Sequence, residues 1–304
     1  MHVFLAGSTS VLGRRVLPLL LDGGHQVTAL IRDPRQAPQI AALGAGTAVA
    51  DARDRGAVAA AVAAARPDVV MQQLTDLASG TSASNAALRI SATRSLVDAA
   101  LAAGVQRVIA QSIAWASEPG SEPADEATSL DVYAEPARRM TVNGINALEQ
   151  ATREAPEWVV LRYGLLYGNG TWYPPAGARG VDARAGRLVA DADISSFVKV
   201  DDAAAAAVDA LHWPSGVATV CDDEPAAGHD WLPAFCAAVG APPPATSTRP
   251  RTPWARGASN RHVREDLGWA PSHRSWRTGF QAMSHPCGED PRRSKRDEPD
   301  HRSP

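Results

Sequence analysis

The chain has 304 residues, 45% of them hydrophobic and 21% charged, which is enough for a large domain with a substantial core. Its net charge of −3 and isoelectric point of about 6.2 argue against nucleic acid or an anionic membrane as a partner. The three cysteines lack metal-type spacing and no signal peptide is recognisable, so we expect a cytoplasmic protein without a bound metal.

Segments typical of strands and helices alternate along the first half of the chain. Strands are predicted at residues 3–6, 26–31, 47–50, 68–73, 107–111 and 157–163. Helices are predicted at residues 11–21, 57–65, 83–103 and 136–154. Repeated strand–helix units of this length predict an α/β protein, with a parallel sheet covered by helices on both faces.

The second half carries two segments of unusual composition. Residues 241–253 are rich in proline and predict an irregular connection. Residues 284–304 contain no aliphatic or aromatic side chain, so they cannot bury apolar surface and are expected to be a disordered tail.

The stretch AGSTSVLG, residues 6–13, lies between the first predicted strand and the first predicted helix. A glycine-rich turn in this place is typical of a site for the pyrophosphate of a dinucleotide, which binds at the helix N-terminus. Gly7 and Gly13 occupy the outer positions of the motif, but Ser10 stands where a third glycine is usual. We expect the turn to bind a nucleotide through Gly7, Thr9, Ser10, Val11, Leu12 and Gly13.

The second predicted strand is followed by Arg32, about 20 residues after the glycine-rich turn. An acidic side chain here would accept hydrogen bonds from a ribose, whereas an arginine pairs with a 2′-phosphate. Arg32 therefore favours NADP(H) over NAD(H), and Arg14 offers a second cation. The alternative is that Arg32 is a solvated surface residue.

Several stretches together resemble the extended short-chain dehydrogenase/reductases, the NAD-dependent epimerase/dehydratase family. They are FLAGSTSVLG at 4–13, VADARD at 49–54, PDVVMQQL at 67–74, AGVQRVIAQSIAW at 103–115, WVVLRYGLLYGNGTWY at 158–173, SSFVKVDDAAAA at 195–206 and ASNRHVREDLGW at 258–269. The similarity covers roughly residues 1 to 280.

The resemblance implies a doubly wound Rossmann fold with a small C-terminal substrate-binding lobe. It divides the chain into an NADP-binding domain at 1–165, a mixed segment at 166–283 that completes the sheet and forms the lobe, and the tail at 284–304. Asp51 and Ala52 would border the adenine, and Leu74 and Thr75 would line the cofactor path. For Asp51, a carboxylate that caps a turn is an equal alternative.

One departure from the family concerns catalysis. The family uses a tyrosine as acid and base, with a lysine four residues later, but here those positions fall on Thr141 and Ile145. A threonine hydroxyl is a poor proton donor near neutral pH. Tyr133 is the nearest tyrosine in the sequence, but no lysine follows it at the required spacing. The resemblance also places Ser112 beside the nicotinamide, although one alignment puts the serine position on Ile113.

Aromatic residues gather after the fifth and sixth predicted strands, at the sheet edge where ligands bind in such folds. We expect Tyr163 or Tyr167 to act as proton donor and Trp115, Trp172 and Tyr173 to contact the substrate; the alternative is that they are packing residues. For Arg89, on the long predicted helix, a surface salt bridge is expected more than contact with an anion.

These observations predict an NADP(H)-dependent oxidoreductase or epimerase-type enzyme that acts on a carbonyl or carbinol carbon of a small organic molecule. Ser112, Thr141, Tyr163 and Tyr167 are the candidate catalytic residues. Two alternatives stay open: a non-redox enzyme that performs dehydration or cyclisation in the same cleft, and a catalytically inactive NADP(H)-sensing protein. The sequence also leaves open whether the chain forms a homodimer.

Overall fold

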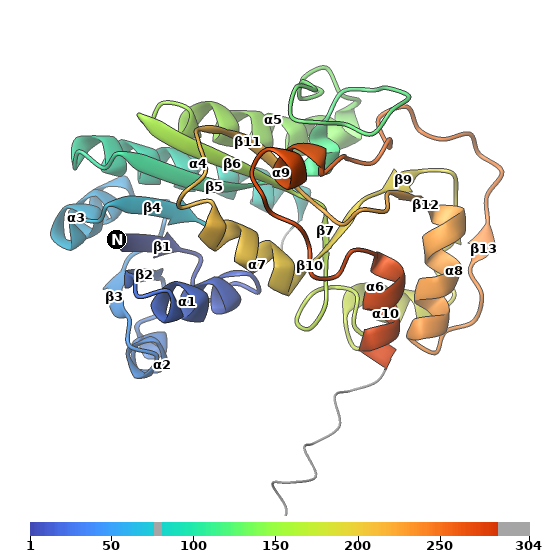
Figure 1. Ribbon diagram of the computed structural model, residues 1–304, viewed down its shortest axis with the longest axis horizontal. Coiled ribbons are helices and arrows are strands. Elements are labelled where there is room, and N and C mark those ends of the chain that lie inside the picture. Colours follow the sequence, from blue (N-terminus) through green and yellow to red (C-terminus); the bar gives the residue numbers. More distant parts are fainter. Residues whose placement is uncertain (76–80, 285–304) are drawn as a thin grey trace, which may run out of the picture.

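The computed structural model describes residues 1–75 and 81–284, and a seven-stranded parallel sheet forms its centre (Figure 1). The strands are β1 (His2–Ala6), β2 (Gln26–Ile31), β3 (Gly46–Val49), β4 (Val69–Gln72), β5 (Arg107–Ile113), β6 (Glu157–Tyr163) and β11 (Gly216–Val220). Their order in the sheet is β11-β6-β5-β4-β1-β2-β3. This is the predicted Rossmann arrangement, in which the strand order reverses between β1 and β4.

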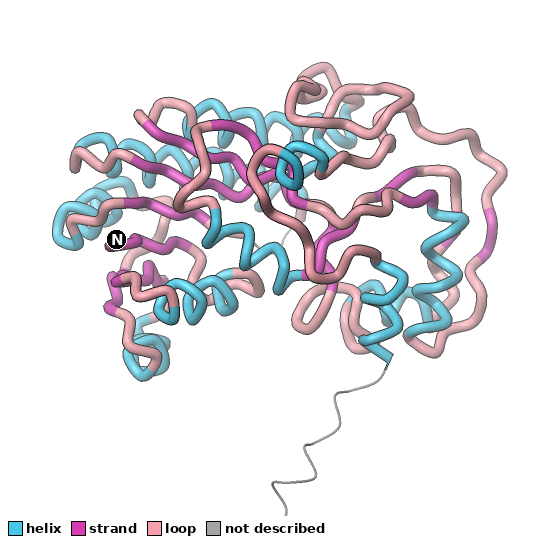
Figure 2. Tube along the Cα trace, viewed as in Figure 1, coloured by secondary structure: helices cyan, strands magenta, loops and turns pink. Residues whose placement is uncertain are grey.

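Helices cover both faces of the sheet, as the alternating pattern predicted (Figure 2). One face packs against α1 (Gly13–Asp22), α2 (Ala37–Ala42) and α7 (Val200–Asp209). The other packs against α3 (Arg55–Ala65), α4 (Ser82–Ala102) and α5 (Pro136–Thr152). Local signals fix the helix starts, since the side chains of Asp54 and Thr81 accept hydrogen bonds from the first turns of α3 and α4.

The six predicted strands are all present, with ends that shift by up to two residues. The largest difference is at β5, which continues to Ile113 and so includes Ser112. The seventh strand, β11, lies in the segment expected to complete the sheet, although its sequence had not been identified as a strand.

A smaller lobe lies beside the sheet and is formed mainly by residues after β6 (Figure 1). It contains the strand pairs β7 (Leu165–Tyr167) with β10 (Phe197–Lys199), β8 (Val189–Ala190) with β13 (Ala245–Thr246), and β9 (Ile194–Ser195) with β12 (Ala226–Ala227). Its helices are α6 (Ala178–Arg184), α8 (Gly228–Ala238) and α10 (Trp276–Ser284), while the short α9 (Arg261–Glu265) lies against β11. An aromatic cluster forms its core; its members are Tyr167, Tyr173, Phe197, Trp231, Phe235, Trp276 and Phe280.

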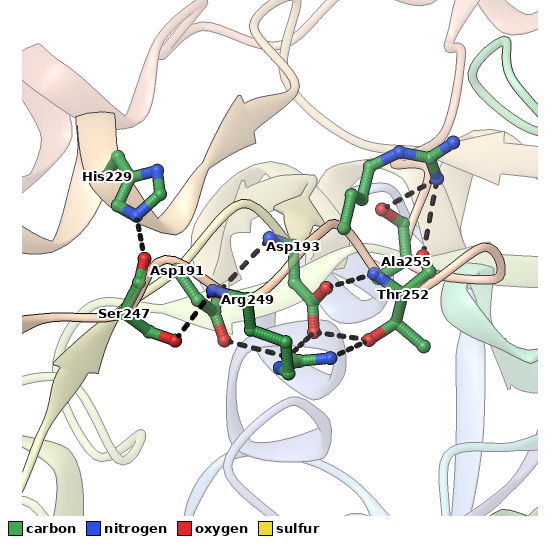
Figure 3. A network of polar contacts seen from close by, with 8 residues as sticks. Asp191, Asp193, His229, Ser247, Arg249, Thr252 and Ala255 are labelled. Carbon is green, nitrogen blue, oxygen red and sulfur yellow. Dashed lines mark hydrogen bonds and ion pairs between the residues drawn. The ribbon is translucent and has the colours of Figure 1, made fainter.

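The proline-rich connection is held against this lobe by a polar network (Figure 3). Arg249 pairs with Asp191 at 3.2 Å and Asp193 at 2.8 Å, and Asp193 also accepts from the backbone of Thr252 at 2.6 Å. The ring of His229, on α8, bonds to the carbonyl of Ser247 at 2.9 Å. The segment is irregular apart from β13, as predicted, and these contacts give it a defined course.

The sequence predicted a C-terminal tail and no membrane as a partner. The predicted tail begins at Ser284, the last residue of α10, and its remaining residues, 285–304, lie outside the described residues. In the part of the chain that the structure describes, no helix combines the length and apolar character needed to cross a membrane.

Asp222 follows β11 and is 1% exposed at the junction of the sheet and the lobe. Its backbone N–H donates to the carbonyl of Phe197 at 2.6 Å. Its Oδ1 accepts weakly from the N–H of Glu224 at 3.3 Å, and its Oδ2 has no hydrogen-bond partner among the described residues. Burial is the main reason why the pKa of this carboxyl rises from 3.8 to about 8.

We expect this carboxyl to make folding depend on pH. Between about pH 4 and pH 8 the folded chain holds a proton that the unfolded chain releases, so the free energy of unfolding falls as pH rises through this window. Each unit of pKa shift corresponds to about 1.4 kcal/mol. Asp222→Asn should therefore raise the melting temperature more at pH 8 than at pH 5, as measured by thermal denaturation. The exposed Asp230→Asn serves as control, and parallel pH profiles for wild type and Asp222→Asn would contradict the assignment.

Candidate functional site

The residues predicted to bind a cofactor lie together at one edge of the sheet. The glycine-rich turn follows β1, Arg32 follows β2, Asp51 follows β3 and Leu74 follows β4. Because these strands are neighbours and parallel, their carboxyl ends meet at the crevice where the strand order reverses. The geometry is that of a dinucleotide site, and contact by individual residues stays a prediction.

The glycine-rich turn depends on two missing side chains. Gly7 has φ +92°, and a Cβ added to it would lie 2.4 Å from the carbonyl oxygen of Gln73. A Cβ on Gly13 would lie 1.9 Å from the carbonyl oxygen of Gly7. The turn therefore closes tightly against the end of β4, with the N-terminus of α1 at its edge. Such a cradle fits the pyrophosphate of NAD(P)H.

Ser10 is held by two hydrogen bonds inside this turn. Its hydroxyl donates to the carbonyl of Gln73 at 3.2 Å and accepts from the N–H of Gly13 at 3.0 Å. The residue that replaces the usual glycine thus connects the turn both to β4 and to α1. Around it, Leu12 is buried, while Thr9 and Val11 are half-buried.

Arg32 is exposed and has no carboxylate partner among the residues that the structure describes. The neighbouring Asp33, which could otherwise contact a ribose, already binds Arg35 at 2.8 Å and caps a short 3-10 helix, η1 (Pro34–Gln36). Asp51 is likewise engaged, because its carboxylate accepts from the side chain of Arg53 at 2.7 Å and from its N–H at 2.9 Å.

These two bonds are the main reason why the pKa of Asp51 falls to about 2. Asp51 therefore has the geometry of a turn-capping carboxylate, which was the alternative to contact with the adenine. The neighbouring Ala52 is buried. Arg32 is left available to an incoming anion.

A cleft of about 180 Å³ continues from the cofactor edge toward the lobe. It is lined by residues from α4, β5, α5 and the segment after β6, namely Thr75, Ser82, Asn85, Arg89, Gln111, Ser112, Ile113, Trp115, Thr141, Tyr163, Gly164, Leu165, Leu166, Thr171, Trp172 and Tyr173. Most of the predicted catalytic and substrate residues are in this set. Leu74 packs on the core next to Thr75.

Ser112 lines the cleft, but its hydroxyl is already used. It donates to Glu149 at 2.8 Å, and Glu149 accepts two further bonds of 2.9 Å from the guanidinium of Arg162. All three residues are at most 3% exposed. A hydroxyl that donates to a buried carboxylate has no proton left to polarise a substrate, so the expected catalytic role of Ser112 does not fit this geometry.

The two tyrosines proposed as proton donors are in places that suit proton transfer poorly, although Tyr163 lines the cleft, and their catalytic role stays a prediction. The hydroxyl of Tyr163 donates to the backbone of Ala203 at 3.3 Å, inside the core between the sheet and α7. Tyr167 is absent from the cleft and packs edge-on against Phe280 with ring centroids 5.3 Å apart. Burial raises the pKa of both phenols above the ordinary value of 10, which makes them poorer sources and acceptors of protons near neutral pH.

Three other expected residues divide between the cleft and the surface. Thr141 lines the cleft from α5, as the alignment predicted, whereas Tyr133 is 90% exposed outside it. Tyr173 lines the cleft but also stacks on Phe280 at 5.8 Å, and burial raises its pKa to about 12. It therefore belongs both to the predicted substrate site and to the packing alternative.

Trp115 and Trp172 line the cleft with 37% and 41% of their surface exposed. Trp115 follows β5 in a short 3-10 helix, η2 (Ala114–Ala116), and its ring lies 6.5 Å from that of Trp254. The loop that carries Trp172 is fixed to α1, because Arg15 donates to the carbonyl of Asn169 at 2.6 Å. Half-exposed aromatic rings on anchored segments suit contact with a flat ligand.

Arg89 also lines the cleft and forms no surface salt bridge with the described residues, so that expectation was wrong. Neither Gln111 nor Gly144 was identified from the sequence. Gln111 lines the cleft and has a buried Oε1 that no described residue contacts by hydrogen bond. Gly144 lets α5 approach α4, since a Cβ there would lie 2.9 Å from the Cα of Ala86.

Comparison with known proteins adds two findings. A family model described as NAD(P)H-binding matches residues 7–213. A 3-diazoavenalumate denitrifying reductase from a Streptomyces species is 42% identical to this chain over 305 residues, which cover 92% of this chain and 99% of that protein.

Solved structures match at lower identity and show the fold. The UDP-glucose 4-epimerase of Thermus thermophilus, in complex with NAD, has a TM-score of 0.71 at 22% identity and covers 93% of this chain and 98% of its own. That of Thermotoga maritima, with UDP-glucose, has a TM-score of 0.72 at 20% identity and covers 93% and 97%. The epimerase-type Rossmann fold implied by the sequence resemblance is thus confirmed.

The hydrogen bonds of Ser10 lead to a prediction about the turn. Ser10→Ala removes both of them at once, at a typical cost of about 0.5–1.5 kcal/mol each. We expect lower thermal stability and weaker NADPH binding, measured by calorimetric titration. Thr246→Ala is the control, because it removes an exposed hydroxyl on β13, outside the glycine-rich turn. Unchanged affinity in Ser10→Ala would mean that the turn keeps its shape without this residue.

Proposed function

The chain belongs to the NAD(P)H-binding family, and from this premise we propose that it is an NADP(H)-dependent reductase that removes dinitrogen from a small, flat diazo carboxylate. The proposal combines the composition of the cleft with the printed function of its Streptomyces relative, a denitrifying reductase of 3-diazoavenalumate. The suffix of that substrate's name denotes an acid, and its prefix denotes the diazo group.

The observation that carries the proposal is the lack of acid–base groups in the cleft. Among the described residues that line it there is no Asp, Glu, His, Lys or Cys. Its tyrosines have raised pKa values, and Ser112 donates to Glu149. Reduction of a carbonyl, or epimerisation of an alcohol, needs a group that moves a proton to or from oxygen. The cleft is better suited to a reduction that moves none.

Loss of dinitrogen is such a reduction. A bound dinucleotide would supply a hydride, so that the diazonium form of the substrate, R–N₂⁺, and H⁻ would give R–H and N₂. A C–H bond forms, the C–N bond breaks with its electron pair leaving on nitrogen, and no proton is exchanged with the protein. The absence of the family's tyrosine and lysine is then a consequence of the chemistry, and the redox interpretation is favoured over a sensor or a dehydratase.

The residues of the chain would act by orientation and shielding. Trp115 and Trp172 would pack on the faces of a flat substrate, and Ile113 with Leu166 would exclude water from the carbon that accepts hydride. Gln111 offers a buried amide to a polar substituent. Thr141 would contact the substrate without passing it a proton.

Cofactor preference rests on Arg32. We expect Arg32→Ala to weaken NADPH binding by about 10- to 100-fold, the usual effect of one charge-assisted contact, and to leave NADH binding nearly unchanged. Calorimetric titration with each dinucleotide measures both effects, and Arg184→Ala, which removes an exposed cation on α6 of the lobe, is the control. Equal losses for NADPH and NADH in Arg32→Ala would contradict a contact with the 2′-phosphate.

The proposed loss of dinitrogen can be measured directly. With NADPH and 3-diazoavenalumate, the purified chain should release N₂ and oxidise NADPH in equal amounts, followed by gas analysis and absorbance. Thr141→Val should lower the rate less than about tenfold, because loss of a general acid would cost about 10²–10⁴-fold. NADPH oxidation without N₂, or abolished turnover in Thr141→Val, would contradict the proposal.

A further inference from the structure

One face of α4 borders the cleft. Ser82, Asn85 and Arg89 all line it, and their spacing of three and four residues places them in one row on the helix. Gly144 brings α5 close to this helix, so Thr141 lines the same cleft from across the contact. Arg89 thus lies in the wall of the cleft on one of two closely packed helices.

Arg89 is the one formally charged side chain among the described residues that line the cleft. It makes no hydrogen bond or ion pair with any residue of 1–75 or 81–284. The next arginine on the same helix behaves differently, since Arg94 binds Asp98 at 2.6 Å and Glu154 at 2.7 Å. A half-buried arginine without a carboxylate is uncommon, because removal of a charge from water is costly unless a partner restores the lost interactions.

Burial lowers the pKa of Arg89 to about 10, and no neighbouring carboxylate among the described residues opposes that shift. The side chain therefore still carries its charge at neutral pH. A charged guanidinium in this position creates a local positive potential, which no described residue of the cleft wall cancels.

We propose that Arg89 binds the carboxylate of the substrate and selects acids over their neutral analogues. The guanidinium can hold a carboxylate by two parallel hydrogen bonds, which fixes the direction of the molecule as well as its charge. The half-exposed rings of Trp115 and Trp172 accommodate the flat body of the substrate in the same cleft. This inference rests on the proposed function for the chemistry of the reaction, but the anion site itself depends only on Arg89 and its surroundings.

The test uses binding first, so that it does not depend on turnover. Full-length protein saturated with NADP⁺ is titrated with 4-hydroxycinnamate, a flat acid without a diazo group, and with 4-hydroxycinnamamide, followed by tryptophan fluorescence. We expect wild type to prefer the acid. Arg89→Gln should weaken binding of the acid by about 10- to 100-fold and leave the amide unchanged. Arg89→Lys should recover part of the affinity, because the charge remains without the planar fork.

The matched control is Arg94→Gln, which removes the same charge from the same helix outside the cleft and should leave the preference for the acid intact. A second readout is the KM for 3-diazoavenalumate, which should rise in Arg89→Gln while kcat changes little. Equal affinity of wild type for acid and amide, or an equal loss for both in Arg89→Gln, would overturn the anion site. If the binding preference is present but no N₂ forms, the reaction proposed above fails and the anion site stands.

Discussion

The close approach of the glycine-rich turn to the end of β4 is the constraint on which the site depends. Gly7 and Gly13 leave no room for a Cβ, and Ser10 bonds to both sides of the turn. This contact fixes the N-terminus of α1 at the point where the strand order reverses. Arg15 then connects α1 to the loop that carries Trp172, so the cofactor edge and the cleft share one support.

A second fixed element lies beneath the cleft. Glu149 on α5, Ser112 on β5 and Arg162 on β6 form a buried network in which the carboxylate receives three hydrogen bonds from these two partners and a fourth, of 3.2 Å, from Arg153. Removing one partner of such a network leaves an uncompensated charge, so it strongly favours one packing of α5 on the sheet. In the same network the Ser112 hydroxyl donates its hydrogen to Glu149, so it has none to donate to a substrate. Among the described residues, the cleft is left with aromatic walls, one unpaired cation and no acid, and the proposal of hydride transfer without proton transfer rests on this combination.

The pattern of strands and helices was readable from the sequence because apolar runs and helix stop signals are local. Because Arg32 and Asp51 each follow a predicted parallel strand, this pattern also placed them at the carboxyl ends of the strands. The positions of the Tyr163 and Tyr167 rings could not be predicted, because the same sequence spacing allows a side chain to face the cleft or the core. Their contacts with Ala203 and Phe280 in the folded chain determine which way each ring faces. Arg89 was misjudged for a related reason: a helix pattern gives the face of a residue, but whether a described carboxylate lies opposite it is a property of the folded chain.

The central claim is that the new C–H bond takes its hydrogen from the dinucleotide and that no protein acid takes part. Isotope labelling tests it most directly, with wild-type protein and 3-diazoavenalumate in two parallel reactions. One uses NADPH deuterated at C4 in the transferred position in H₂O, and the other uses NADPH in D₂O, with product mass as the readout. The account predicts one deuterium in the product of the first reaction and none at that carbon in the second. Deuterium entering that carbon from D₂O, with none from the labelled NADPH, would contradict it.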